Sequence, residues 1–295
     1  MHHPSPAVSR RVVIGAGLAT ASWLAACAPG PGPDSTSTVS APAPEPSPTS
    51  GPTATPVPTR AELDRTALSE KYAGRVPKEW GLDVTGVPGR TEADGVLLTL
   101  DLCGGPGGAA LDQRLIDLLV EHEVPAGVFV NARWIDANPG AVERLVDTGL
   151  IDMANHGTSH RPLSVNGRAA YGINGTKDVG AAIDEVLGCH EKLTAITGRA
   201  PRWFRSGTAH YDEVAVEIVR ELGEIPVGFS VNGDAGATLS SGQVAAALRT
   251  VTKGDIVIAH ANRPDGATAE GFAAALPQLL ATGTRFIRLA DAELI

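Results

Sequence analysis

Two histidines four residues apart are the first residues in this chain whose type and spacing could do chemistry. His156 and His160 lie in the segment Asn-His-Gly-Thr-Ser-His. If this segment takes a helical turn, both imidazoles face the same way and can share a divalent metal ion. The spacing alone is a weak signal, so the role of the pair depends on which other groups the fold brings to it.

Further reactive side chains occur directly after short apolar runs, where strands are expected to end. They are Asp101, Arg205, Asp234 and His260. Taken singly, Asp101 would be a turn or cap residue, and His260 would be a core histidine. Arg205 and Asp234 would form a structural ion pair. Their recurrence at equivalent positions favours one shared site.

β-rich runs and helical patterns alternate along the chain after Gly95. The predicted strands cover residues 96–101, 126–130, 151–154, 203–204, 225–230, 255–259 and 285–288. The predicted helices cover residues 111–119, 139–148, 183–193, 212–222, 243–251 and 269–281. Such alternation implies parallel strands with right-handed crossovers. We therefore predict an α/β fold, a distorted (β/α) barrel of about seven strand–helix units.

An open nucleotide-binding sheet is the main alternative fold. The glycines at 104, 105, 107 and 108 follow the first predicted strand, but their spacing is not GxGxxG. No acidic residue stands where a ribose would need one. In a barrel, the active site forms at the carboxyl ends of the strands. The reactive side chains named above fall at those ends.

The order of these segments resembles the polysaccharide deacetylase family, the carbohydrate esterase type with a NodB homology domain. Five family motifs have counterparts from about residue 95 onwards. The counterparts are Thr99–Gly105, His156–His160, Phe204–Thr208, Val231–Asp234 and Ile258–His260. The resemblance implies a hydrolase that removes N-acetyl groups from amino-sugar polymers, such as peptidoglycan or an extracellular glycan.

The resemblance also implies a metal site and a general base. His156 and His160 would hold a divalent metal, expected to be Zn²⁺, which acidifies a water molecule and polarises the acetyl carbonyl. Asp101 would accept the proton from that water, and Arg205 would hold Asp101 ionised and oriented.

A general acid and an oxyanion donor complete the implied site. His260 would protonate the leaving amine, kept protonated and aimed by Asp234. The backbone N–H near Thr208 would donate to the oxyanion.

Several positions depart from the family pattern. Leu102 replaces an aspartate that ligates the metal, and it cannot ligate. Cys103 could supply a thiolate, although adjacent residues at a strand end usually point apart. Gly207 and Thr208 replace Pro-Tyr, and Ala235 stands where the family has a tryptophan. These changes leave the metal, its third ligand and the glycan undetermined.

Two other functions remain open. One is a hydrolase of small non-peptide amides on the same barrel, working with little or no metal, which the missing ligand favours. The other is a non-catalytic glycan-binding lipoprotein. Retention of His156, His160 and His260 argues against the latter.

The first residues predict export and a lipid anchor. Residues 1–27 carry Arg10-Arg11, an apolar run and Leu-Ala-Ala-Cys, a pattern typical of a lipoprotein signal peptide. The adjacent arginines resemble a twin-arginine export signal. Cys27 would be lipidated on the outer face of the cytoplasmic membrane. Residues 28–75 are predicted to be a linker, rich in Pro, Ser, Thr and Ala over most of their length, and residues 76–295 the catalytic domain.

The composition of the chain limits the classes of molecule that it can be expected to bind. The formal net charge of −9 argues against nucleic acid, whose phosphates require a basic face. Three cysteines provide no disulfide framework, and aromatic residues make up only 4%. An acetylated glycan and a membrane are the expected partners.

Overall fold

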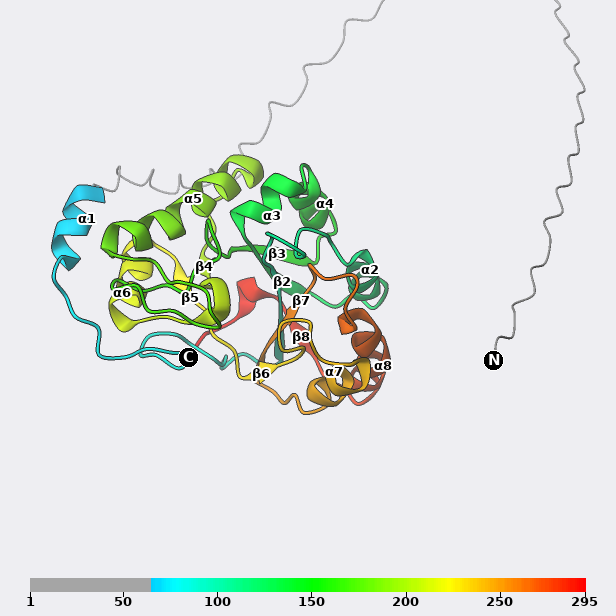
Figure 1. The fold of residues 1–295 in the computed structure, drawn as a ribbon. Coiled ribbons are helices and arrows are strands. Elements are labelled where there is room, and N and C mark those ends of the chain that lie inside the picture. The colour runs from blue at the N-terminus through cyan, green and yellow to red at the C-terminus, as the bar shows by residue number, and fades with distance from the viewer. Residues whose placement is uncertain (1–64) are drawn as a thin grey trace, which may run out of the picture. The chain divides into compact units, whose positions relative to one another are not determined.

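A parallel sheet forms the centre of the computed structural model, which describes residues 65–295 (Figure 1). Its strands are β1 (Val96–Leu102), β2 (Ala126–Val130), β3 (Ile151–Asn155), β4 (Trp203–Phe204), β5 (Ile225–Pro226), β6 (Val231–Asn232), β7 (Ile256–His260) and β8 (Phe286–Ile287). Their order is β5-β4-β3-β2-β1-β7-β6, and β8 pairs with the start of β1. The predicted distorted (β/α) barrel is confirmed.

Helices follow most of the strands and pack around the sheet. They are α1 (Arg65–Tyr72), α2 (Gln113–Glu121), α3 (Ala132–Ala137), α4 (Ala141–Asp147), α5 (Val179–Thr197), α6 (Glu213–Glu221), α7 (Ser241–Leu248) and α8 (Thr268–Ala281). Local sequence sets several of their ends. The Asp178 and Asp212 side chains accept hydrogen bonds from backbone N–H groups of α5 and α6, and Gly198 ends α5 in the left-handed region.

One segment joins the two edges of the curled sheet. The sequence predicts a single strand over residues 225–230, but the chain forms two short strands instead. Ile225 pairs with Trp203 of β4, whereas Val231 pairs with Val257 of β7. Pro226 has no N–H to continue a ladder, and the chain then crosses to the other edge. This segment therefore bridges the gap in the barrel.

The folded part of the chain begins before residue 76. Helix α1 lies within the range predicted to be a linker, and its Leu68 and Tyr72 are buried in a cluster with Ile183 of α5 and Ile218 of α6. The predicted signal peptide, Cys27 and most of the predicted linker lie outside the described residues. In the part of the chain that is described, no helix has the length and apolar character needed to span a bilayer.

Strand β1 separates two cores by the alternation of its side chains. Leu98, Leu100 and Leu102 belong to the large cluster that packs against the surrounding helices. Leu97 belongs to a second cluster with residues of the neighbouring strands, such as Phe129. Because side chains alternate between the faces of a strand, Asp101 shares its face with Leu97 and not with Leu102. Leu102 is therefore a core residue, fully buried on the helix side.

We expect Leu102→Asp to destabilise the protein without creating a metal ligand. A carboxylate at this position would lie unpaired in an apolar core. The loss should be at least the roughly 2–5 kcal/mol typical of a buried Leu→Ala change. Denaturant unfolding measures this, with Leu102→Met as a control that should cost less than about 1.5 kcal/mol. A Leu102→Asp variant as stable as the wild type would contradict this and show that residue 102 can turn toward the site.

Candidate metal and acid–base site

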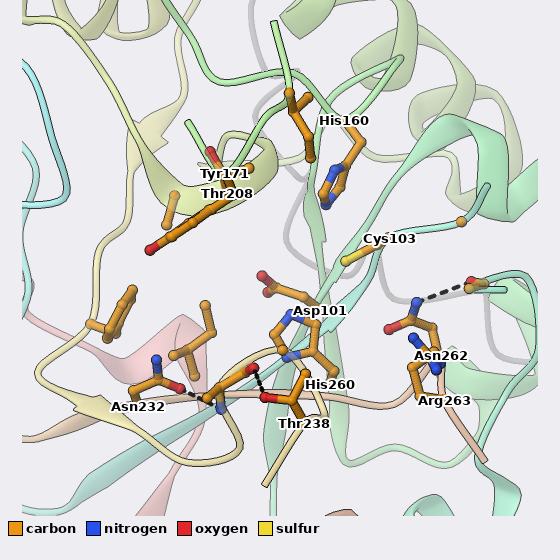
Figure 2. Close-up of a pocket in the computed structure, with 18 of the residues that line it drawn as sticks. Asp101, Cys103, His160, Tyr171, Thr208, Asn232, Thr238, His260, Asn262 and Arg263 are labelled. Carbon is orange, nitrogen blue, oxygen red and sulfur yellow. Dashed lines mark hydrogen bonds between the residues drawn. The ribbon is translucent and has the colours of Figure 1, made fainter. Parts of the chain in front are cut away.

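The carboxyl ends of the strands surround a cavity of about 500 Å³, a size typical of small-ligand sites. Its lining includes Asp101, Cys103, His160, Thr208 and His260. Figure 2 shows the side chains of Asp101, Cys103, His160 and His260 gathered in one part of this cavity. The structure thus brings together residues that are far apart in the sequence.

A fully buried arginine holds Asp101. The Arg205 guanidinium donates to the Asp101 carboxylate at 2.8 Å and to the Thr99 hydroxyl at 2.9 Å. It also donates to the carbonyls of Val227 and Gly228, and it lies 4.2 Å from the centre of the Phe129 ring. Donors pointing in several directions are thus paired, which allows a cation to remain buried.

This pairing sets the protonation of Asp101. Burial opposes ionisation of the carboxyl group, but the positive charge of Arg205, with His156 and His260 nearby, outweighs it. The pKa of Asp101 therefore lies below its ordinary value. An ionised carboxylate facing the cavity can accept a proton.

His156 is oriented by the same arginine residue. Its Nδ1 lies 2.8 Å from the backbone carbonyl of Arg205. A carbonyl can only accept, so Nδ1 carries the hydrogen and Nε2 is left toward Asp101 and Cys103, at 3.6 and 3.7 Å. A histidine that ligates through one nitrogen while donating from the other is the usual arrangement at metal sites.

His160 reaches the site on a loop, not on the helical turn considered from its spacing. β3 ends at Asn155, and His160 has a left-handed φ of 59°. The buried Glu185 carboxylate of α5 accepts hydrogen bonds from the backbone N–H groups of Ser159 and Arg161 and so holds the loop. The two imidazole rings lie 4.9 Å apart at 85° to each other.

A close approach of two backbones also fixes His160. A β-carbon added at Gly207 would lie 2.2 Å from the carbonyl carbon of His160. Any side chain at 207 would therefore push the His160 loop away. This explains in physical terms why glycine occupies a position where the family pattern has proline.

Three potential metal ligands converge here. The Cys103 sulfur and one nitrogen each of His156 and His160 all lie within 4.8 Å of one another. Burial alone would raise the pKa of the thiol, but contacts with His156, His160 and His260 lower it well below its ordinary value. Two imidazoles and a thiol are a donor set that suits zinc-like ions, so the residues present fit a divalent metal.

His260 and Asp234 form the second charged pair. The Asp234 carboxylate, fully buried, accepts hydrogen bonds from His260 Nδ1 at 2.9 Å and from the His260 backbone N–H at 2.7 Å. The Thr268 hydroxyl and the Gly236 N–H also donate to it. His260 is therefore fixed in one orientation, with its other nitrogen available to the cavity.

The pairing with Asp234 favours the protonated form of His260. Burial opposes the charged imidazolium, but the hydrogen bond to Asp234 and contacts with Cys103 overcome it. The pKa of His260 is raised well above its ordinary value. The site thus offers an ionised carboxylate and a protonated imidazole to the same cavity.

Thr208 lies on another wall of the cavity, with a left-handed φ of 76°. Its buried hydroxyl oxygen has no hydrogen-bond partner within the described residues. The predicted role of a nearby backbone N–H as oxyanion donor stays a prediction.

Asn262 was missed by the sequence analysis. Its amide nitrogen donates to the Gly108 carbonyl, while its buried Oδ1 is without a partner among the described residues (Figure 2). Asn262 lines the cavity, so this oxygen is a ready acceptor for a bound molecule. Its position two residues after His260, on the same face of the strand's continuation, was the available signal.

The fold and site define a distorted (β/α) barrel with a candidate metal and acid–base centre at its strand ends. Residues 89–225 match the family model described as polysaccharide deacetylase. A 78-residue stretch is 37% identical to a chitooligosaccharide deacetylase of Sinorhizobium fredii (strain NBRC 101917 / NGR234). That match covers 26% of this chain and 34% of the relative, so the chain spans about a third of that protein.

Solved structures show the same fold at low identity. A CE4 family pseudoenzyme from Bacillus anthracis is 19% identical with a TM-score of 0.59, and the match covers 72% of this chain and 69% of that one. A family 4 acetyl xylan esterase from Clostridium thermocellum, in complex with a cobalt ion, is 21% identical with a TM-score of 0.55. There the coverage is 66% of this chain and 88% of that one.

Proposed function

We propose that this protein removes N-acetyl groups from amino-sugar polymers, peptidoglycan or another extracellular glycan, by metal-assisted amide hydrolysis. The observation that carries the proposal is the placement of two oppositely arranged buried pairs, Asp101 with Arg205 and His260 with Asp234, at one cavity. Asp101 is held ionised by Arg205, and His260 is held protonated by Asp234. Amide hydrolysis needs both a base for water and an acid for the leaving amine.

The residues divide the reaction between them. Asp101 accepts the proton of the attacking water, and Arg205 keeps the carboxylate oriented through its hydrogen bond. His260 donates a proton to the nitrogen of the amino sugar as the C–N bond breaks. His156 and His160 would hold a divalent metal, proposed to be Zn²⁺, which would supply Lewis acidity at the acetyl group.

Acetate release tests the proposal directly. We expect release from N-acetylated oligosaccharides or peptidoglycan, dependent on added zinc or cobalt, and less from O-acetylated xylan. Asp101→Asn should lower turnover by about 10²–10⁴-fold, the range for loss of a general base. An unfolding curve for the same variant shows whether loss of the ion pair with Arg205 has destabilised the fold.

Two results would contradict the proposal. Activity of Asp101→Asn equal to the wild type would exclude Asp101 as the base. Absence of acetate from every N-acetylated polymer would favour either a small-amide substrate or a non-catalytic glycan binder. A panel of small amides and a glycan-binding assay on the same preparation separate those two.

The pH profile should depend on Asp234. His260 serves as the acid only below its raised pKa, so activity is lost as pH rises through that value. Asp234→Asn removes the anion that raises this pKa, so the alkaline limb should move to lower pH. Asp101 and Cys103 also face His260, so the limb reports coupled groups.

Thr268→Val is the matched control for that measurement. It removes one hydrogen bond to Asp234 but leaves the negative charge in place. Its alkaline limb should therefore move less than that of Asp234→Asn. An alkaline limb unchanged in Asp234→Asn would assign the limb to another group.

We further propose that the chain is exported and anchored by lipid on Cys27, at the outer face of the cytoplasmic membrane. The sequence Leu24-Ala25-Ala26-Cys27 after an apolar run supports this. Cys27→Ala should move the protein from the membrane fraction to the soluble fraction while the wild type stays bound. Equal membrane association of both proteins would contradict the anchor.

A further inference from the structure

Cys103 occupies the place at which the site lacks a carboxylate. It follows β1 directly, and the alternation of the strand puts it on the face of Asp101, two residues earlier. Leu102, the residue that aligns with the family's ligand, points into the helix-side core. The cavity side of this strand end is therefore occupied by the cysteine.

The turn after Cys103 keeps the thiol in place. Gly104 has a φ of 67°, and a β-carbon there would lie 2.6 Å from the backbone nitrogen of Trp134. The Cys103 carbonyl accepts a hydrogen bond from the Arg133 guanidinium at 3.2 Å. The backbone of Cys103 and the glycine that follows it thus both contact α3.

We propose that Cys103 supplies a thiolate as the third protein ligand of the metal held by His156 and His160, in place of a carboxylate. This rests on the proposed function only in sharing its metal. A tetrahedral zinc with ordinary bond lengths would put its sulfur and nitrogen ligands roughly 3.6 Å apart. The Cys103 sulfur lies 3.7 Å from His156 Nε2.

A thiolate changes which metal the site prefers. Thiolates are softer ligands than carboxylates and favour zinc or cobalt over magnesium or manganese. The thiolate has the same single negative charge as the carboxylate that it replaces. A site with three protein ligands leaves one position for water or substrate, as in catalytic zinc sites.

A different role for Cys103 would use other neighbours. Cys103 and His260 line the same cavity, and Asp234 orients His260, which is the order of groups in a thiol nucleophile with its base. The ligand role is favoured because two imidazoles converge on the sulfur and His156 presents its free nitrogen to it. An acetyl group trapped on Cys103 would instead identify the thiol as a nucleophile.

Cobalt spectroscopy of the full chain tests the ligand. With Cys27→Ala as background, we expect one Co²⁺ per chain and a thiolate-to-cobalt charge-transfer band in the near ultraviolet. Cys103→Ser should remove the band and weaken zinc binding by at least the roughly 10–100-fold caused by losing an outer-shell partner. Cys189→Ala is the matched control, because the Cys189 thiol is buried and donates a hydrogen bond to the Val130 carbonyl. The Cys189→Ala protein should therefore keep the charge-transfer band.

Replacing sulfur by oxygen separates the two roles. Cys103→Asp should retain one bound metal per chain without the band, with relatively greater affinity for manganese. A band that survives in Cys103→Ser, or cobalt bound to the parent protein without a band, would overturn the proposal. So would an acetyl thioester trapped on Cys103 in metal-free protein.

The readouts also keep this proposal apart from the proposed function. A charge-transfer band without acetate release from any N-acetylated glycan would retain the ligand and reject the deacetylase. Acetate release with no band in the cobalt-loaded parent protein would retain the deacetylase and reject the ligand.

Discussion

The buried Arg205 side chain is the interaction on which both the core of the barrel and its site depend. An unpaired guanidinium would be strongly destabilising inside a protein, so its donors must all be directed at fixed acceptors. Those acceptors lie on β1 and on the segment that bridges β4 and β7. The Arg205 carbonyl in turn orients His156. Removing one member of such a buried pair typically costs about 3–5 kcal/mol, so the position of Asp101 is coupled to the stability of the barrel.

A second buried carboxylate, Asp234, stabilises a protonated imidazole beside Asp101, because His260 pairs with Asp101 in the register of β1 and β7. Asp234 is saturated by backbone and hydroxyl donors and has His260 as its cationic partner. Asp101 faces the guanidinium of Arg205, whereas His260 faces the carboxylate of Asp234. The fold thus separates a proton acceptor from a proton donor by giving each a buried partner of opposite charge, within one cavity.

The strand–helix alternation was predictable from sequence because it depends on local periodicity. The strand-end positions of Asp101 and His260 followed from it. The role of residue 102 did not, because counting along the motif aligns Leu102 with a ligand, while the pleat of β1 turns it toward the helices. Glu185 could not be found in the same way, since it acts on a loop more than twenty residues earlier in the chain. Helix α1 was not predicted because most of its residues are polar and only Leu68 and Tyr72 are buried.

The loop from Gly157 to Arg161 is fixed by hydrogen bonds from several elements. Asn131 donates to the carbonyls of His156 and Gly157, and Glu185 accepts from the loop's own N–H groups. The conformational entropy of this loop is therefore lost when the chain folds and not when an ion arrives. Zinc fingers, by contrast, order their ligands only on metal binding. Here the hydrogen bonds of the fold already hold the loop that carries His160, so binding of the proposed metal would not require the domain to fold around the ion.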